Sequence, residues 1–132
     1  MEFTINTSKK FEVIDINKQV KDIISKSSVN HGLCNVFTKH TTTAVIINEN
    51  NDPHIGVDLV VALDKLIPEG KWLHDEIDDN GAAHLKSAIL GPSETMQIKD
   101  SELVLGTWQS LMFVELDGPR KRIISVEILR NR

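Results

Sequence analysis

The segment 32-GLCNVFTKHTTTAVIIN-48 decides the fold class of this 132-residue chain. It is rich in β-branched residues, which favour strands, and the polar stretch KHTTT interrupts it. The sequence therefore predicts two paired strands with KHTTT near their connection. The second strand, TAVIIN at residues 43–48, shows no polar alternation and is predicted to be buried on both faces.

Towards the N-terminus, residues 2–7 and 10–16 have the composition of two short strands separated by a Ser-Lys-Lys turn. A helix is predicted to begin near Asp15 or Asn17, because apolar residues then recur at helical spacing. Its buried stripe is predicted to consist of Val20, Ile23 and Ile24.

Towards the C-terminus, Asp52 followed by Pro53 matches a helix N-cap with proline at the first helical position. Apolar residues continue at helical spacing from Val57 to Ile67, so this helix is predicted to pack against the sheet and to end before Pro68.

The stretch 68-PEGKWLHDEIDDNG-81 contains five acidic residues and predicts a long loop, and long ordered loops often carry function. A short helix over residues 82–90 follows and stops at Gly91-Pro92. Three strands are then predicted, at residues 94–99, 102–116 and 121–129. Gly106 is expected to mark a bulge or bend in the long middle strand.

This order of strands, helices and strands predicts an α+β fold, a largely antiparallel β-sandwich with two or three helices, in a single domain over residues 1–132. The sequence contains no glycine-rich phosphate loop of the GxGxxG or GxxxxGK[ST] type. A parallel nucleotide-binding fold is therefore disfavoured.

Composition narrows the class of protein. The formal net charge of −4 argues against a broad nucleic-acid-binding surface, and no apolar run approaches the ~20 residues that cross a bilayer. The N-terminus lacks the basic start and apolar block of a secretory signal, so we expect a cytoplasmic protein without a membrane partner. The single cysteine, Cys34, is expected to be a small buried side chain.

Three of the five histidines lie in segments of unusual polarity: His40 in KHTTT, His74 in WLHDE and His84 in AAHLKS. If the three rings converge, they can hold a divalent metal ion, with nearby Thr41 and Asp75 orienting the rings. No pair has a local ligand spacing such as HxxxH, so the alternative of three separate histidines stays open.

The acid-and-amide run 48-NENND-52 offers a second group. Glu49 is a candidate general base, and Asn48 and Asn50 are candidates for orienting a substrate through paired donors and acceptors. The alternative is that residues 50–52 turn the chain and cap the helix, which is the role we favour for Asp52.

A third group has the chemistry of an anion site. Lys86 and Ser87 lie in the short helix that begins after Gly81, and Arg120 and Arg122 follow the last turn. Helix N-terminal amides, lysine and arginine all bind oxyanions. The alternative for Lys86 is a solvated position in the middle of the helix.

Trp108 and Gln109 form a fourth candidate group, in which the indole lines a pocket and the amide hydrogen-bonds to a ligand. The alternative for a tryptophan on a long central strand is a place in the core.

Three ordered motifs, HTTTAVIINENNDP, WLHDEIDDNGAAHLKSAILGPS and LGTWQSLMFVELDGPRKR, resemble those of the YjbQ-like family, which is associated with a secondary thiamine-phosphate synthase activity. The resemblance covers roughly residues 35–125. It implies a compact α+β sandwich that assembles as a homotrimer, with a candidate active site at or near the subunit interfaces.

The family's pattern selects the same three histidines, and Trp72 stands where the family usually has tyrosine. Its positions in this chain are His40, Thr41, Thr42, Asn48, Glu49, Asn50, Asp52, Asp58, His74, Asp79, His84, Lys86, Ser87, Gly106 to Gln109, Glu115 and Arg120.

The resemblance implies a small metal-dependent transferase that joins a pyrimidine pyrophosphate to a thiazole phosphate. The expected catalytic residues are Glu49, His40 and His84, and the expected metal ligands, for Zn²⁺ or Mg²⁺, are His40, His74 and His84. Substrate or phosphate binding is expected of Asn48, Asn50, Lys86, Ser87, Trp108, Gln109 and Arg120. The alternative is a non-catalytic trimeric module that binds a metal or a small phosphorylated ligand in an interface pocket.

Overall fold

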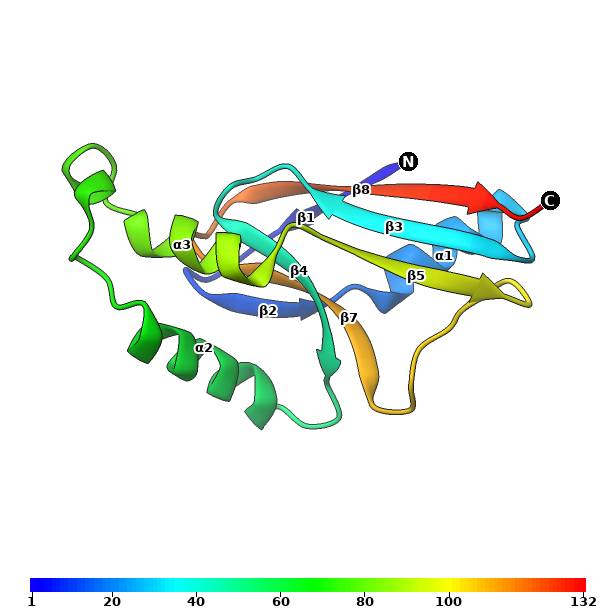
Figure 1. The fold of residues 1–132 in the computed structure, drawn as a ribbon, viewed down its shortest axis with the longest axis horizontal. Coiled ribbons are helices and arrows are strands. Elements are labelled where there is room, and N and C mark those ends of the chain that lie inside the picture. The colour runs from blue at the N-terminus through cyan, green and yellow to red at the C-terminus, as the bar shows by residue number, and fades with distance from the viewer.

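The computed structural model describes residues 1–132 and contains two antiparallel sheets (Figure 1). The first sheet has the order β1 (Glu2–Asn6), β8 (Lys121–Arg130), β3 (Gly32–Thr38), β5 (Ser93–Lys99) and β6 (Glu102–Leu103). The second sheet has the order β2 (Glu12–Asp15), β7 (Gln109–Glu115) and β4 (Thr43–Glu49). The predicted α+β class with antiparallel sheets is confirmed.

Three α-helices and one short 3₁₀ helix complete the fold. They are α1 (Asn17–Ser27), α2 (His54–Leu66), η1 (Leu73–Glu76) and α3 (Gly81–Leu90). None of the helices has the length and apolar character that spanning a membrane requires.

The main hydrophobic core lies between the two sheets. Val36 and Val126 from the first sheet meet Val45 and Phe113 from the second in one buried cluster, to which α1 adds its predicted stripe. Removing this apolar surface from water is the main force that holds the sheets together. Cys34 belongs to the same cluster, and burial raises the pKa of its thiol to about 11.

The strands predicted in residues 32–48 are present, but the prediction that they pair with each other is wrong. β3 pairs with β5 and β8, whereas β4 pairs with β7 in the other sheet. A side-chain contact joins the two strands at their connection: the hydroxyls of Thr38 and Thr43 hydrogen-bond to each other at 2.9 Å. The KHTTT stretch therefore crosses from one sheet to the other.

The single long strand predicted over residues 102–116 is also wrong. The chain forms the short β6, leaves the first sheet, and enters the second sheet as β7. Instead of a bend within one strand, the chain around Gly106 passes from the first sheet to the second. There the Gly106 N–H donates to the Gln109 side-chain oxygen at 2.7 Å.

Helix α2 begins at His54, one residue after the predicted first position Pro53, and packs against the second sheet as predicted through Leu59. The Asp52 carboxylate accepts the N–H groups of His54 (2.7 Å) and Ile55 (3.3 Å), which confirms its capping role. Only Leu63 of this helix is buried, and Val57 is 62% exposed. The helix lies beside the second sheet (Figure 1). Its Val57 and Val61 side chains are exposed.

Candidate functional site

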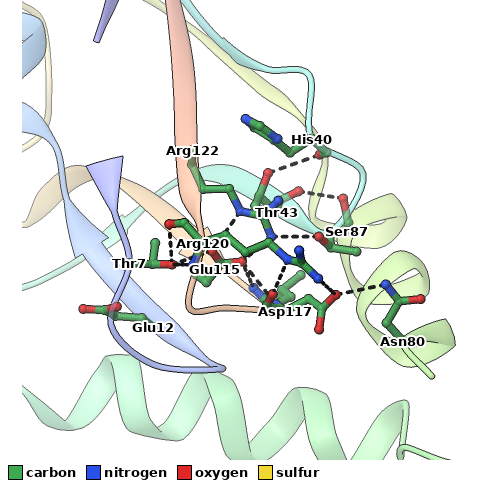
Figure 2. Close-up of polar contacts among 12 residues, drawn as sticks. Thr7, Glu12, His40, Thr43, Asn80, Ser87, Glu115, Asp117, Arg120 and Arg122 are labelled. Atoms are coloured by element: carbon green, nitrogen blue, oxygen red, sulfur yellow. Dashed lines mark hydrogen bonds and ion pairs between the residues drawn. The ribbon is translucent and has the colours of Figure 1, made fainter. Parts of the chain in front are cut away.

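The connection between β3 and β4 is held by three hydrogen bonds of its own. The Thr43 hydroxyl donates to the His40 carbonyl at 3.1 Å, and the His40 N–H donates to the Thr38 hydroxyl at 3.3 Å. The Thr38–Thr43 hydroxyl pair closes the set. The Ser87 hydroxyl donates to the Thr43 carbonyl at 2.6 Å and so fixes α3 against this turn (Figure 2).

The His40 ring has a defined tautomer because its Nε2 accepts the Ile123 N–H at 3.0 Å. The neutral ring therefore carries its proton on Nδ1. Burial, followed by the nearby Arg122 guanidinium, lowers the pKa of His40 below its ordinary value. The neutral imidazole is thus the favoured form near pH 7, with Nδ1–H available as a donor.

Arg122 and Glu115 form a buried ion pair behind this turn (Figure 2). Arg122 is 4% exposed and donates from Nε and Nη2 to the two carboxylate oxygens of Glu115, at 2.8 and 2.5 Å. Its Nη2 also donates to the Thr42 hydroxyl at 2.8 Å. This forked arrangement fixes the plane of the guanidinium.

Further donors satisfy the Glu115 carboxylate. The Thr7 hydroxyl donates to it at 2.7 Å, and the N–H groups of Leu116 and Asp117 donate at 3.1 Å each. Burial alone raises the pKa of this carboxyl, but the hydrogen bonds from Arg122, Thr7 and Asp117 outweigh it and hold the pKa below its ordinary value. Glu115 therefore stays ionised and keeps Arg122 in place.

Arg120 and Asn80 converge on Asp117 from the other side (Figure 2). Arg120 donates from Nε to the Asp117 carbonyl (2.8 Å) and from Nη2 to its carboxylate (3.2 Å), and the Asn80 amide donates to the same carboxylate at 2.9 Å. These contacts link the β7–β8 turn to the start of α3. The side-chain oxygen of Asn80 is buried and has no partner.

A pocket of about 370 Å³, which we call the polar pocket, opens between these groups, and no hydrophobic residue lines it. Its walls are Lys39, His40, Thr41, Thr42, Asp78, Asn80, His84, Asp117, Arg120 and Arg122. Neither Nη1 of Arg120 nor Nη1 of Arg122 donates a hydrogen bond within the chain. Beside the carboxylates of Asp78 and Asp117, the pocket thus offers unused guanidinium donors, an ammonium group and two imidazoles, groups that bind an oxyanion.

The three predicted histidines come only partly together. The rings of His74 and His84 pack edge to face with centroids 4.6 Å apart, whereas His40 uses its Nε2 on Ile123. No group of three histidine, cysteine, aspartate or glutamate side chains in the chain is arranged to hold a metal ion. One chain alone therefore does not fit the expected three-histidine centre, which stays a prediction for ligands shared between subunits.

Only some residues of the predicted anion site lie where they can contact an anion. Lys86 is 1% exposed and its ammonium pairs with Asp64 of α2 and lies 4.8 Å from the centre of the Phe11 ring. The Gly81 N–H at the start of α3 donates to the Asp75 carboxylate at 2.8 Å, so a side chain already occupies this helix end. Of the predicted set, Arg120 and Arg122 line the polar pocket.

The acid-and-amide group lies at the far end of β4. Glu49 pairs with Gln109 in the β4–β7 ladder, and Asn50 donates to Asp15 at 2.9 Å. Trp108 is 60% exposed beside them, so the alternative of a core position is wrong. The seven residues of β4 extend over about 20 Å, which separates Glu49 from His40 and His84 within one chain.

Four residues of the polar pocket were not selected from the sequence: Lys39, Asp78, Asn80 and Asp117. Lys39 directly precedes the chosen His40, and Asp117 opens the DGPR turn before Arg120. Their polar character and their closeness in sequence to selected residues were the only signals that could have identified them. Only the fold shows that these two turns meet the start of α3.

Comparisons with known proteins agree over the whole chain. Residues 1–131 match the family described as UPF0047 protein YjbQ-like. The UPF0047 protein of Methanocaldococcus jannaschii is 39% identical over 131 residues, covering 99% of this chain and 94% of that protein. The UPF0047 protein of Archaeoglobus fulgidus is 42% identical over 130 residues, covering 98% of this chain and all of that protein.

Solved structures show the same fold. A YjbQ/UPF0047 protein from Clostridium acetobutylicum has a TM-score of 0.93 at 41% identity and covers 98% of this chain and 99% of its own. A YbjQ-like protein of unknown function from Sulfolobus solfataricus has a TM-score of 0.95 at 37% identity and covers 99% and 96%. The chain, with its two-sheet fold and its polar pocket, belongs to the YjbQ-like UPF0047 family.

Proposed function

We propose that the chain is an enzyme that acts on a small phosphorylated ligand bound in the polar pocket. The observation that supports this function is the buried Arg122, which Glu115 holds in a fixed plane while its Nη1 has no protein acceptor. A guanidinium oriented in advance binds phosphate oxygens without losing side-chain entropy on binding.

The basic and imidazole side chains of the pocket wall each have a role in this proposal. Arg122, Arg120 and Lys39 bind the phosphate oxygens, and the Nδ1–H of His40 donates a further hydrogen bond. His84 has no hydrogen bond to its ring within the chain, so it is the group available for proton transfer at the pocket wall.

The family resemblance gives the proposed reaction its name, thiamine-phosphate synthesis. In that reaction the bond between the pyrimidine methylene carbon and a pyrophosphate oxygen breaks, and the thiazole ring nitrogen forms the new bond to carbon. The departing pyrophosphate takes the electron pair. Arg120, Arg122 and Lys39 are suited to stabilise the negative charge that develops on it.

The test is an assay of the purified protein with the pyrimidine pyrophosphate and the thiazole phosphate, in which thiamine phosphate and pyrophosphate are both measured. Arg120→Gln should lower kcat/KM by about tenfold or more, because it removes a charged donor from the pocket. The matched control is Arg130→Gln, an exposed arginine on β8 that does not line the pocket. Product from both variants at the wild-type rate contradicts the proposal.

A binding module without turnover is the second candidate. Phosphate binding that depends on Arg120, together with no product from the wild-type protein, favours that alternative.

We also propose that the protein assembles as a homotrimer. Apolar side chains of α2, of η1 with the residue that follows it, and of α3 are exposed on one chain: Val57, Val61, Leu66, Leu73, Ile77 and Ile89. An apolar surface of this kind is typical of an interface between subunits. Sedimentation of the wild-type protein at three times the chain mass is the expected result, and Val57→Asp should shift it to the chain mass.

A trimer also provides a way for Glu49 to reach a polar pocket, that of a neighbouring subunit. The test mixes Glu49→Ala subunits with Arg120→Gln subunits, each with strongly reduced activity alone, through unfolding and refolding. If one site takes Glu49 and Arg120 from different subunits, random mixing in equal amounts restores about a quarter of the wild-type activity. Mixed trimers that stay inactive show that the two residues do not serve a shared site.

We include a divalent metal in the proposal only at a site whose ligands come from two subunits. The His74–His84 pair supplies two imidazoles, whose nitrogens favour zinc over magnesium, and the other ligands have to come from a neighbouring subunit. Elemental analysis of the purified protein tests this point. Zinc that is present in the wild type and lost in His74→Ala supports it, and wild-type protein without bound metal contradicts it.

A further inference from the structure

The sequence contains one Asn-Gly pair, Asn80-Gly81, and it lies where the polar pocket meets the start of α3. An asparagine that precedes glycine is prone to deamidation, because glycine has no side chain to hinder the attack of its backbone nitrogen on the asparagine side chain. The chain therefore carries a chemically labile residue in a wall of its proposed binding site.

Deamidation at this pair starts when the Gly81 nitrogen forms a bond to Cγ of Asn80. The bond from Cγ to the side-chain nitrogen breaks, and ammonia leaves with the proton that the Gly81 nitrogen loses. Water then opens the five-membered succinimide ring at either carbonyl carbon, which gives aspartate or isoaspartate. Water is the co-reactant, and no atom is oxidised or reduced.

The fold holds Asn80 away from the geometry of this ring. Ring closure requires the Gly81 nitrogen to eclipse the Asn80 Cβ, and the ψ angle of 27° at Asn80 does not bring the nitrogen into that position. A change of ψ would pull the Gly81 N–H away from the Asp75 carboxylate, which accepts it at 2.8 Å. It would also disturb the first turn of α3, where the His84 N–H donates to the Asn80 carbonyl at 3.3 Å.

The Asp75 carboxylate is itself held in place. Its second oxygen accepts the Trp72 N–H at 3.1 Å. The Gly81 N–H, followed by the Trp72 N–H, lowers the pKa of Asp75 below its ordinary value, so this carboxylate is a weak base towards the Gly81 proton. Asp75 is therefore suited to restrain the Gly81 nitrogen and not to start the reaction as a base.

The side-chain amide of Asn80 is restrained as well (Figure 2). Its nitrogen donates to the Asp117 carboxylate at 2.9 Å, and its oxygen is buried. The same carboxylate accepts Nη2 of Arg120 at 3.2 Å. Deamidation would remove the amide donor and place a second negative charge beside Asp117, so it would turn a hydrogen-bonded pair in the pocket wall into a like-charge pair.

We infer that Asn80-Gly81 is a deamidation site, that the Asp75 carboxylate suppresses the reaction in the folded chain, and that the product weakens anion binding in the polar pocket. The third part rests on the proposed binding of phosphate there, whereas the first two concern the chain alone. The inference gives η1 a role, because Asp75 of this helix protects a wall of the polar pocket although no residue of η1 lines it.

Peptide mapping by mass spectrometry measures the reaction at this one site. Cleavage after Lys71 and Lys86 releases residues 72–86, in which Asn80 is the only side-chain amide. In mildly alkaline buffer, the folded wild-type protein should deamidate at least about tenfold more slowly than the same protein unfolded in urea, because the reaction requires local opening. Equal rates in the two states overturn the inference.

Asp75→Ala should raise the rate in the folded protein several-fold, because it frees the Gly81 N–H. Glu76→Ala is the matched control, since this neighbouring carboxylate is exposed and does not accept the Gly81 N–H, and it should react at the wild-type rate. An unchanged or slower rate in folded Asp75→Ala overturns the role of Asp75. The comparison of folded with unfolded wild-type protein decides the protection of the site even if this variant does not fold.

The effect of the product on the polar pocket is tested with Asn80→Asp and inorganic phosphate. Calorimetric titration should find the affinity of this variant about tenfold lower than that of the wild type, owing to the added negative charge. Asn131→Asp, a change at an exposed position outside the polar pocket, is the matched control. Equal affinity of Asn80→Asp and the wild type overturns the third part of the inference. No binding of phosphate by the wild type overturns the proposed function, and the deamidation rates still decide the first two parts.

Discussion

The two ends of β4 carry similar polar residues but are built in opposite ways. At the end that starts with Thr43, the pocket residues are fixed by a buried ion pair and by hydroxyls that bond to one another. At the end that finishes with Glu49, the side chains of Asn48 and Trp108 are exposed. A site that must bind an anion without reorganising needs the first kind of construction.

The difference indicates which end forms a binding site in a single chain. The pocket end holds Arg122 in position before any ligand arrives, at the cost of burying two charges. The Glu49 end has no comparable support and becomes a site only if a second subunit covers it. The predictions below test this contrast.

The largest expected effect is on stability. Glu115→Ala leaves the buried Arg122 without its partner and should lower the free energy of unfolding by about 3–5 kcal/mol. Glu49→Ala, at the other end, should change it by less than about 0.5 kcal/mol. Urea unfolding followed by circular dichroism measures both variants, and similar losses in the two would contradict the contrast.

The Glu115–Arg122 ion pair should also make the unfolding free energy of the wild-type protein depend on pH. The pKa of Glu115 is held below its ordinary value of 4.5, so its contribution to stability is complete above pH 4.5 and is lost as the pH falls through the folded pKa. Unfolding free energies measured from pH 7 to pH 3 should fall less steeply for Glu115→Gln than for the wild type. Curves for Glu115→Gln and the wild type that run parallel over this range would refute the assignment.

Protonation of His40 should also lower the unfolding free energy as the pH falls, by a smaller amount. Its pKa is lowered below 6.5, first by burial and then by Arg122, so acidification through 6.5 removes stability as the unfolded chain takes up the proton first. Proton NMR should find the His40 ring titrating below pH 6.5, with the Ile123 amide signal moving in step. A titration at or above 6.5 is the contrary result.

The smallest effect is expected at Trp108. Because 60% of this residue is exposed in one chain, Trp108→Ala should change the unfolding free energy of the monomeric Val57→Asp background by no more than about 0.5 kcal/mol. A loss of several kcal/mol in thermal or urea unfolding would show that Trp108 supports the fold.

Local signals predicted most of the elements. The stripe of Val20, Ile23 and Ile24, the cap at Asp52 and the stop at Gly91 depend on neighbours in the sequence, and all three are present. Strand pairing depends on distant segments, so the β-branched composition of residues 32–48 could not show that β3 and β4 belong to different sheets.

The candidate site divides in the same way. His40 and His84 could be selected because polar residues interrupt their segments, but their meeting with Arg122 depends on the crossing of KHTTT between sheets. Lys86 carries the charge that an anion site needs, yet its pairing with Asp64 arises from the packing of α2 on α3. Side-chain chemistry was predictable from sequence, and its placement was not.

The most direct test of the central claim is a titration of isotope-labelled protein with inorganic phosphate, followed by amide and arginine side-chain NMR signals. We predict saturable shifts at His40, His84, Arg120 and Arg122 that are larger than any shift at Asn48, Glu49 and the Trp108 indole. Saturable shifts confined to the Glu49 and Trp108 end, or no saturable shift at the polar pocket, would contradict the account.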